Sequence, residues 1–593
     1  MKDLAYLNKF FFKYRWRLIP GVLFVIISNI FGVLPAQVIR VAFDLVTENI
    51  GMFQLFSGFN RQPVIYDIFG SSLLLFGMLV LALLRGLFLF FMRQTIILMS
   101  RHIEYDLKNE IYSHYQQLSL AFYRRHNTGD LMNRVTEDVS RVRMYLGPGI
   151  MYTINTVVLF IMVIYAMLTV NLRLTIFSVL PLPVLAMLIY YVNNIINFRS
   201  EKIQQRLSAL SSFVQENFSG IRVIKSYIRE GHLRNSFAAE SENYKTHSMA
   251  LVKVQALFYP IMMMLVGLSN VITIYIGGIE VMKGNITSGN IAEFIVYLNL
   301  LTFPVISLGW VTSLIQRAAA SQKRINEFLH TTPEIISPDV PGRAIEGQIE
   351  FNNVSFVYPD TGIQALKNIS FIVKPGEMVA IIGRTGSGKS TIANLIMRMY
   401  DCTAGELLID GERIQNLNLD SYRSQIGFVP QEVFLFSDTI ANNIAFSADR
   451  LDMPGVEQAA KDAAVYNNIM ELESGFETLI GERGVTLSGG QKQRVSIARA
   501  IVKQPQILIL DDCLSAVDTR TEEEILRHLG RNMRGKTSII IAHRISTIKN
   551  ADKILVVDNG EIIEHGTHQY LMDQRGAYFE LYEKQLLEEE ENA

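Results

Sequence analysis

The chain has 593 residues and a formal net charge of −1, with 49% apolar and 19% charged residues. This length predicts several domains, and the apolar excess favours a membrane protein. A nearly neutral chain without a basic face gives no reason to expect a nucleic-acid partner, and two cysteines (Cys402 and Cys513) imply neither a disulfide framework nor a spaced metal site.

Six apolar segments in the first half of the chain each approach the roughly 20 residues that are needed to cross a bilayer. They cover residues 18–39, 68–92, 150–170, 172–192, 258–282 and 291–315. Buried helices of a large soluble protein are the alternative, but so many segments in one half of the chain favour membrane spans. Residues 1–330 are therefore expected to form an all-α transmembrane domain with six helices.

Basic residues are unevenly distributed between the sides of these spans. The segments before the first span and between the second and third spans are rich in lysine and arginine. The opposite side is poor in positive charge: the loop between spans one and two carries Arg61, and the loop between spans five and six carries Lys283. Cytoplasmic segments carry the positive excess in membrane proteins. We therefore expect a multi-pass protein of the cytoplasmic (inner) membrane, with the N-terminus and the C-terminal half of the chain in the cytoplasm.

Two polar, helix-rich stretches separate the second span from the third and the fourth from the fifth. At 1.5 Å per residue, such helices would extend the spans well beyond the membrane surface. The turn-containing segments 122–131 and 219–227 are suited to docking on another domain as the tips of these arms, and ordinary solvated loops are the alternative.

The composition changes near Pro333, where apolar segments give way to mixed charges and turn residues. Residues 331–348 contain three prolines and are expected to be a linker. Residues 349–583 have the pattern of a soluble α/β domain, and residues 584–593 form an acidic tail.

The run 383–390 (Gly-Arg-Thr-Gly-Ser-Gly-Lys-Ser) has the spacing of a phosphate-binding loop between a strand and a helix. Its glycines let backbone N–H groups approach phosphates at a helix N-terminus. Lys389 would reach the β- and γ-phosphates, and the Ser390 hydroxyl would bind Mg²⁺. The expected nucleotide-binding residues here are Gly383, Arg384, Thr385, Gly386, Ser387, Gly388, Lys389, Ser390 and Thr391.

Two further patterns follow in the soluble half. An apolar strand at 506–510 ends in Asp511 and Asp512, which places a carboxylate where a Mg²⁺ ligand is needed, and we assign that role to Asp511. The pentapeptide 487–491 precedes a helical pattern, so that its glycines again present backbone donors at a helix N-terminus. Its residues are Leu487, Ser488, Gly489, Gly490 and Gln491.

Together with Gln431 after a strand, the run 515–518 and His543 after another strand, these motifs resemble the ATP-binding cassette (ABC) family in the expected order. The resemblance covers the whole chain, which looks like a type IV exporter half-transporter whose arm tips are similar to that family's coupling helices. It implies a multidomain protein with an α/β P-loop nucleotide-binding domain that uses ATP and Mg²⁺. It also implies a dimer in which each ATP lies between the phosphate loop of one chain and the pentapeptide of the other.

The resemblance assigns further roles by position. Tyr358 would stack on adenine, and its alternative is a packed strand aromatic. Gln431 would contact Mg²⁺ and the attacking water, and His543 would hold the γ-phosphate end of the transition state, since phosphoryl transfer is catalysed mainly by positioning and charge. Ser515 and Asp518 match the family's D-loop.

The chain departs from the family at Asp512, where a glutamate normally polarises the hydrolytic water. A side chain shorter by one methylene displaces its carboxylate by about 1 Å, which can slow a reaction by about 100-fold. The substitution resembles the weakened-site subunit of heterodimeric bacterial multidrug or lipid exporters. We therefore expect a partner with glutamate at this position and an altered pentapeptide. A homodimer that tolerates aspartate is the alternative.

The expected function is ATP-driven export of amphiphilic small molecules, drugs or lipids by alternating access. A nucleotide-gated regulator or channel on the same fold is a second possibility, although the retained Gln431, Ser488 and His543 argue against it. A third is an importer built on an exporter fold. The sequence does not name the cargo.

Overall fold

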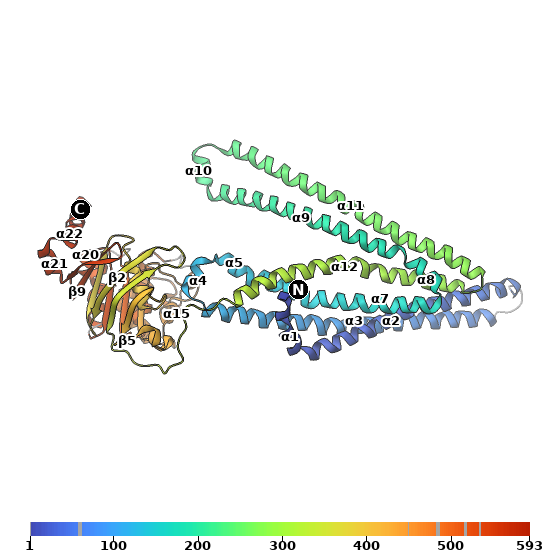
Figure 1. Ribbon diagram of the computed structural model, residues 1–593, viewed down its shortest axis with the longest axis horizontal. Coiled ribbons are helices and arrows are strands. Elements are labelled where there is room, and N and C mark those ends of the chain that lie inside the picture. Colours follow the sequence, from blue (N-terminus) through green and yellow to red (C-terminus); the bar gives the residue numbers. More distant parts are fainter. Residues whose placement is uncertain are drawn as a thin grey trace. The chain divides into compact units, whose positions relative to one another are not determined.

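The computed structural model describes residues 2–56, 62–448, 450–481, 487–514, 519–532 and 535–592. The chain forms two compact units. The first contains the chain up to Tyr115 together with Gly129–Thr331, and the second contains Gln116–Thr128 together with the chain from Thr332 onward. The first unit is helical and the second is built on β-sheets, as the change in composition indicated (Figure 1).

Within the described residues, six helices of the first unit are long and apolar enough to cross a membrane, which confirms the expected six spans. The spans lie in α2 (Arg15–Phe56), α3 (Gln62–Gln117), α7 (Ile150–Val170), α8 (Leu172–Val179) together with α9 (Pro181–Ser219), α11 (Glu230–Met282) and α12 (Ser288–Leu329). Shorter elements are η1 (Lys2–Leu7), α1 (Asn8–Lys13), α5 (Thr128–Asn133), α6 (Val139–Met144), α8 (Leu172–Val179), α10 (Ile221–Ser226) and the π-helical turns η2 (Arg134–Asp138) and η3 (Tyr145–Gly149).

The fourth expected span consists of two helices, α8 and α9, which are separated by the single residue Leu180. Proline cannot donate a backbone hydrogen bond and clashes with the preceding turn, so that a helix starts more readily at proline than it continues through it. Pro181 accordingly occupies the first position of α9, and α8 ends two residues earlier at Val179.

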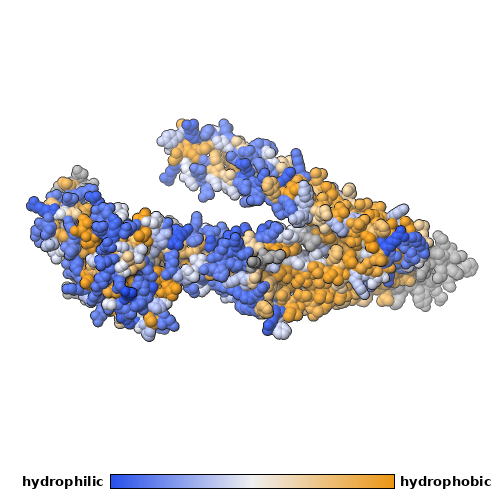
Figure 2. Space-filling view, viewed as in Figure 1, coloured by the Kyte–Doolittle hydropathy of each residue, from blue (hydrophilic) through white to orange (hydrophobic). Residues whose placement is uncertain are grey.

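The surface of the first unit is suited to a bilayer. The leucines at positions 73, 75, 79, 83 and 87 of α3 are all exposed, although leucine in a soluble protein is usually buried. Figure 2 shows hydrophobic residues over the spans and hydrophilic residues toward the arms. Because lipid solvates these side chains, the exposed apolar band is explained by membrane insertion.

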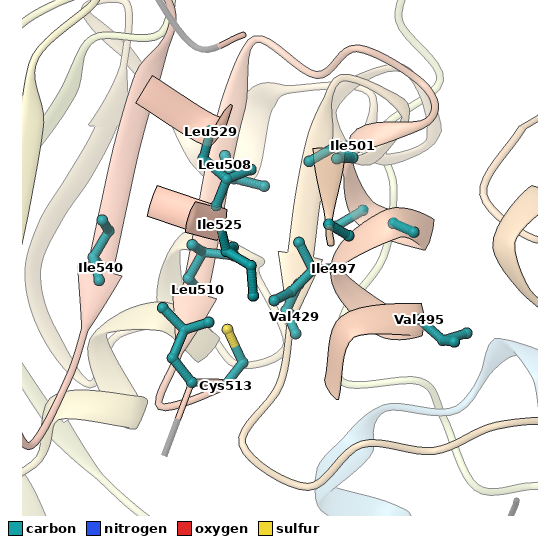
Figure 3. Close-up of a cluster of buried hydrophobic side chains, with 14 of the residues drawn as sticks. Val429, Val495, Ile497, Ile501, Leu508, Leu510, Cys513, Ile525, Leu529 and Ile540 are labelled. Atoms are coloured by element: carbon teal, nitrogen blue, oxygen red, sulfur yellow. The ribbon is translucent and has the colours of Figure 1, made fainter. Parts of the chain in front are cut away.

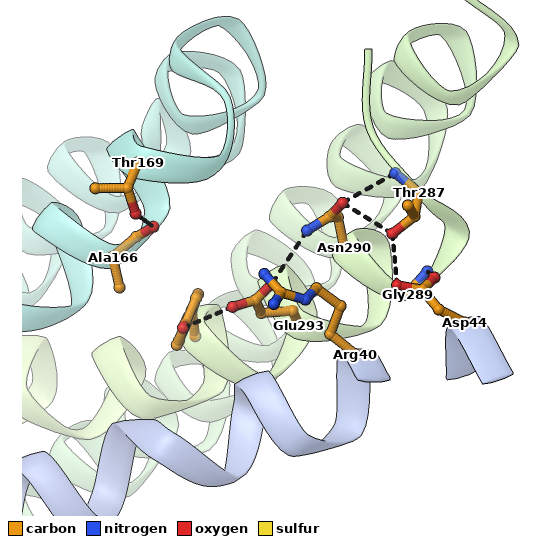
Figure 4. Close-up of polar contacts among 9 residues, drawn as sticks. Arg40, Asp44, Ala166, Thr169, Thr287, Gly289, Asn290 and Glu293 are labelled. Atoms are coloured by element: carbon orange, nitrogen blue, oxygen red, sulfur yellow. Dashed lines mark hydrogen bonds and ion pairs between the residues drawn. The ribbon is translucent and has the colours of Figure 1, made fainter. Parts of the chain in front are cut away.

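A polar network joins α2 to the start of α12 (Figure 4). Asp44 accepts hydrogen bonds from the Gly289 backbone N–H and the Thr287 hydroxyl, each at 2.9 Å. Glu293 is 1% exposed, pairs with Arg40 at 3.5 Å and accepts a hydrogen bond from the Tyr297 hydroxyl at 2.8 Å. Ionisable groups in a membrane domain require partners of this kind, and here they connect two spans.

The second arm is a long hairpin of α9 and α11, with α10 at its tip (Figure 1). Four apolar side chains at the tip are exposed: Ile221, Val223, Tyr227 and Ile228. An exposed apolar cluster on a polar arm is typical of a surface that docks on a protein.

The second unit contains two sheets. An antiparallel sheet has the strand order β2-β1-β4-β5, and a mainly parallel sheet has the order β10-β9-β3-β8-β7-β6. The strands are β1 (Ile349–Val357), β2 (Gln364–Val373), β3 (Met378–Gly383), β4 (Ala404–Ile409), β5 (Glu412–Arg413), β6 (Ile426–Val429), β7 (Ile507–Asp511), β8 (Thr537–Ile541), β9 (Lys553–Asp558) and β10 (Glu561–Gly566).

Helices and turns complete this unit. They are α4 (Leu120–Arg125), α13 (Lys389–Ile396), η4 (Ile414–Asn416), α14 (Leu419–Ser424), α15 (Ile440–Ala445), α16 (Met453–Asp462), α17 (Tyr466–Met470), η5 (Gly475–Glu477), α18 (Gly489–Ile501), α19 (Thr519–Asn532), α20 (Ile545–Ile548), α21 (His568–Gln574) and α22 (Ala577–Asn592). Helix α22 thus includes most of the acidic tail that the sequence indicates.

Both faces of the parallel sheet are buried. Along β7, Leu508 and Leu510 belong to one apolar cluster, whereas Ile507 and Ile509 belong to another. Figure 3 shows the first of these clusters between β7 and helices α18 and α19. Continuous apolar strands covered on both faces are typical of parallel α/β sheets, because side chains alternate between the two faces.

The first arm tip, α4, belongs to the second unit. Ala121 is 1% exposed and lies in the apolar cluster that contains Ile345 and Ile349. Arg125 forms an ion pair with Glu334 at 3.3 Å. The α4 part of segment 122–131 thus packs within the sheet-containing unit, and the docking of the arm tips on another domain stays a prediction.

Candidate nucleotide-binding and hydrolysis site

The parallel sheet brings four separate motifs to one edge. Strands β6, β7, β8 and β3 are parallel neighbours, so that their carboxyl ends lie together. The phosphate loop follows β3, Asp511 ends β7, and Gln431 and His543 follow β6 and β8. Ligands of open α/β sheets bind outside the carboxyl ends of the strands, and these four motifs meet at that edge.

The phosphate loop has the backbone that its glycines allow. Gly386 and Gly388 have φ values of 81° and 103°, in the region that L-residues avoid. A Cβ atom at Gly388 would lie 2.4 Å from the carbonyl oxygen of Ala365. Helix α13 starts at the next residue, so that its N-terminal N–H groups open toward the loop as in an anion site.

Lys389 is held inside this loop. Its Nζ donates hydrogen bonds to the carbonyl oxygens of Gly383 and Arg384, both at 2.8 Å. Burial lowers the pKa of Lys389, and the neighbouring Asp512 and Asp511 oppose that shift. Ser387 Oγ is buried with no hydrogen-bond partner in the described part of the chain. A buried cation beside an unsatisfied hydroxyl fits an incoming phosphate group.

Asp511 and Ser390 face one another at the end of β7. The Ser390 hydroxyl donates to Asp511 Oδ1 at 2.9 Å. Burial raises the pKa of Asp511, as does the nearby Asp512 carboxylate, whereas Ser390 and Lys389 lower it. Hard oxygen ligands of this kind suit Mg²⁺, which binds through one or two protein oxygens and completes its shell with phosphate and water.

Asp512 lies between the two other expected catalytic residues. Gln431 Nε2 donates to Asp512 Oδ2 at 3.4 Å, and His543 Nε2 lies 4.0 Å from the same oxygen. Burial and the positive charge of Lys389 lower the pKa of His543, while Asp512 raises it. The structure therefore brings together the carboxylate, amide and imidazole that the sequence placed in one site.

Tyr358 and Thr391 line the same cavity. The Tyr358 hydroxyl and Thr391 Oγ1 lie 2.9 Å apart. The Arg124 guanidinium lies over the Tyr358 ring, 4.9 Å from its centroid, and donates to the Tyr400 hydroxyl at 3.4 Å. Asp360 lies 3.9 Å from the same guanidinium. Arg124 was not predicted as a site residue from the sequence, where its place in the first arm tip was its only signal.

One cavity of about 460 Å³ unites these residues. Of the expected site residues, those from Thr385 to Thr391, Tyr358, Gln431, Asp511, Asp512 and His543 line it, together with Arg124. Its volume lies within the range of small-molecule and cofactor sites. Gly383 and Arg384 take part through their carbonyl oxygens on Lys389.

The pentapeptide lies elsewhere in the unit. Ser488 caps α18: its hydroxyl accepts from the Gln491 N–H at 3.3 Å, and the Gln491 side chain accepts from the Ser488 N–H at 2.9 Å. Neither these residues nor Leu487, Gly489 and Gly490 are among the described residues that line the cavity. Ser515 and Asp518 lie outside the described residues.

Comparison with known families gives two matches. The family described as "ABC transporter transmembrane region" matches residues 18–305, and the family described as "ABC transporter" matches residues 366–515. The first family corresponds to the helical unit and the second to the sheet-containing unit. The second match falls in the half of the chain that carries the nucleotide-binding motifs.

Relatives and solved structures extend along the chain. The multidrug resistance-like ATP-binding protein MdlA of Escherichia coli is 36% identical over 98% of this chain and 96% of its own length. An ATP-dependent lipid A-core flippase of Syntrophus aciditrophicus is 35% identical over 86% of this chain and 85% of its own length. A bacterial Atm1-family ABC exporter with ATP bound superposes with a TM-score of 0.75, at 28% identity over 96% and 98% of the two chains. The chain is therefore a member of the ABC transporter family with the fold of an exporter, a multi-pass membrane protein with an ATP-binding domain.

Proposed function

We propose that this chain is one half of a dimeric exporter that moves amphiphilic small molecules or lipids out of the cytoplasm. The relatives support this cargo class, because one is named for multidrug resistance and another for lipid A-core. The lipid-suited surface of the spans and the ATP-binding fold agree with such a role. The basic segments flanking the spans favour a cytoplasmic N-terminus and cassette.

The arrangement of the pentapeptide supports a dimer. Its backbone donors at the start of α18 lie outside the chain's own cavity, so that a second cassette is needed to bring such donors to the bound ATP. ATP held between two cassettes would draw them together. Arms that carry this closure to the spans would switch the pathway from inward- to outward-facing.

The Asp512 geometry supports a slow site in this chain. At 4.0 Å from the imidazole and 3.4 Å from the amide nitrogen, its carboxylate has weak contacts with both partners. Aspartate reaches less far than glutamate, and a water between it and the γ-phosphate would be poorly held. We propose that Mg²⁺, bound through Ser390, Asp511 and Gln431, accompanies ATP here, and that a second half-transporter supplies the faster site.

Two measurements test this function. Inside-out vesicles that contain the native complex should accumulate a fluorescent amphiphile when Mg-ATP is added but not with a non-hydrolysable analogue. A regulator or channel would show no ATP-driven accumulation, and an importer would load right-side-out vesicles instead. Intact-complex mass after gentle solubilisation from the native host gives the partner. A complex of two copies of this chain with brisk ATP hydrolysis would contradict the weakened site.

A further inference from the structure

One side chain of the C-terminal helix α22 forms two hydrogen bonds with the backbone around His543. Gln585 of α22 donates from Nε2 to the His543 carbonyl oxygen at 2.5 Å, and its Oε1 accepts from the Ile545 N–H at 2.9 Å. A side-chain amide that pairs with a carbonyl and an N–H two residues apart matches both groups at once. It fixes the main chain on each side of Arg544.

Helix α22 is itself firmly anchored. Tyr578 is fully buried, and Leu581 and Tyr582 pack against the apolar cluster of the parallel sheet. The Glu564 carboxylate accepts from the first N–H groups of the helix, those of Ala577 at 2.6 Å and Tyr578 at 3.0 Å. Gln585 therefore reaches the histidine loop from a rigid support.

Neighbouring residues of the same loop also have fixed partners. Arg544 pairs with Glu522 at 3.3 Å, and Glu522 is 2% exposed. Thr547 donates a hydrogen bond to the same carboxylate. Before the loop, the Ala542 N–H donates to the Ile381 carbonyl oxygen at 3.2 Å. The carbonyl of His543 itself, however, is held by Gln585.

We propose that Gln585 is a positioning residue for His543, so that the C-terminal helix sets the imidazole for the γ-phosphate. The inference rests on the proposed role of His543 in hydrolysis. A catalytic group must be held to within about 0.5 Å of its working position by its supporting contacts. Without the amide, the imidazole would keep its chemistry but lose its orientation, which lowers turnover more than ATP binding.

The test uses the full-length complex with two changes as the background. Asp512→Glu gives this chain's own site measurable turnover, and Ser488→Arg silences the partner's site, which α18 of this chain would complete. Gln585→Ala removes both hydrogen bonds, and Gln585→Glu keeps the acceptor for Ile545 but places a carboxylate against the His543 carbonyl. Both should lower the maximal single-turnover rate about 10-fold and change the ATP concentration at half-maximal rate less than about 2-fold. Gln569→Ala is the matched control, because Gln569 donates to Asp573 within α21.

A double-mutant cycle separates positioning from mere support of the fold. If Gln585 acts through His543, Gln585→Ala should cause no further loss when His543→Ala is already present, whereas independent structural damage would multiply the two losses. The inference alone is overturned if His543→Ala abolishes turnover while both Gln585 variants retain the background rate, or if the losses multiply. If His543→Ala itself retains that rate, the proposed role of His543 fails as well.

Discussion

The Asp512 carboxylate lies 4.0 Å from the His543 imidazole, measured between Oδ2 and Nε2, and both residues line the cavity together with the phosphate loop. Asp512 has a left-handed backbone, with φ of 47°, which aspartate adopts more readily than most residues. Asp512 directly follows the last residue of β7, and it lines the cavity.

Lengthening this side chain should speed hydrolysis. In Asp512→Glu the added methylene moves the carboxylate about 1 Å toward the water. The rate of hydrolysis at this chain's own site, measured in complexes whose partner site is silenced by Ser488→Arg, should rise about 10- to 100-fold. Asp512→Asn is the control, since it has the same length without the charge and should give no gain. A rate for Asp512→Glu at or below that of the same complex with aspartate retained would show that aspartate is already competent.

If the partner supplies the faster site, two variants of this chain should lower steady-state ATP hydrolysis by very different factors. Ser488→Arg blocks the start of α18, which would complete the partner's ATP site, and should reduce steady-state hydrolysis about 100-fold. Asp512→Asn alters the slow site and should reduce steady-state hydrolysis by the complex less than about 2-fold. The rate of steady-state phosphate release, measured for each variant complex and for the unaltered complex, gives both fold-changes. Large and similar losses from both variants would point to a symmetric homodimer.

Arg124 should link the first arm tip to nucleotide binding. Arg124→Ala removes the guanidinium that lies 4.9 Å from the Tyr358 ring centroid, a contact of about 0.5–1 kcal/mol at a partly exposed position, so that ATP affinity should fall about 2- to 5-fold. Stimulation of ATPase by cargo should fall further, because the tip is loosened from the cassette.

Arg125→Ala provides the matched comparison for Arg124. Arg125 pairs with Glu334 and is not among the residues that line the cavity, so that this variant should leave ATP affinity within about 2-fold while still weakening the attachment of the tip. Titration with a fluorescent ATP analogue checks both variants. Equal affinities in Arg124→Ala and the unaltered protein would exclude a role for Arg124 at the nucleotide.

The stability of the nucleotide-free protein should depend on pH through His543. Burial and Lys389 hold the native pKa of His543 below its unfolded value of about 6.5. As the pH falls through 6.5, the unfolded state binds the proton first, so that stability decreases toward the native pKa. In His543→Gln this contribution is absent, and the Tm should change less between about pH 7 and pH 5. Identical pH profiles for the two proteins would contradict the shift.

Features that depend on residues close together in the chain were predictable from the sequence. The phosphate loop follows directly from its spacing between a strand and a helix, and the six spans follow from apolar length. The meeting of Gln431, Asp511 and His543 was also predictable, because each lies at or just after the end of a strand in the motif order that the resemblance implies. Parallel strands then bring their carboxyl ends together.

Other features were not predictable because they depend on tertiary packing. Arg124 reaches Tyr358 across 234 positions of sequence, and Gln585 reaches His543 across 42. Neither pair has a local spacing that indicates contact. The division of the fourth span at Pro181 had a signal in proline itself, but a span can also bend at proline without ending. The left-handed φ of Asp512 is one that aspartate tolerates, but aspartate adopts other conformations more often, so that the residue type alone does not predict it.

The chain passes between its two compact units three times, after Tyr115, Thr128 and Thr331. Two of these crossings fall inside helices, α3 and α5. A cassette expressed alone from Thr332 would therefore lack the α4 segment, and the apolar surface that Ala121 covers would be exposed to water. Such a fragment should be prone to aggregate, and activities measured on it would belong to an incomplete unit.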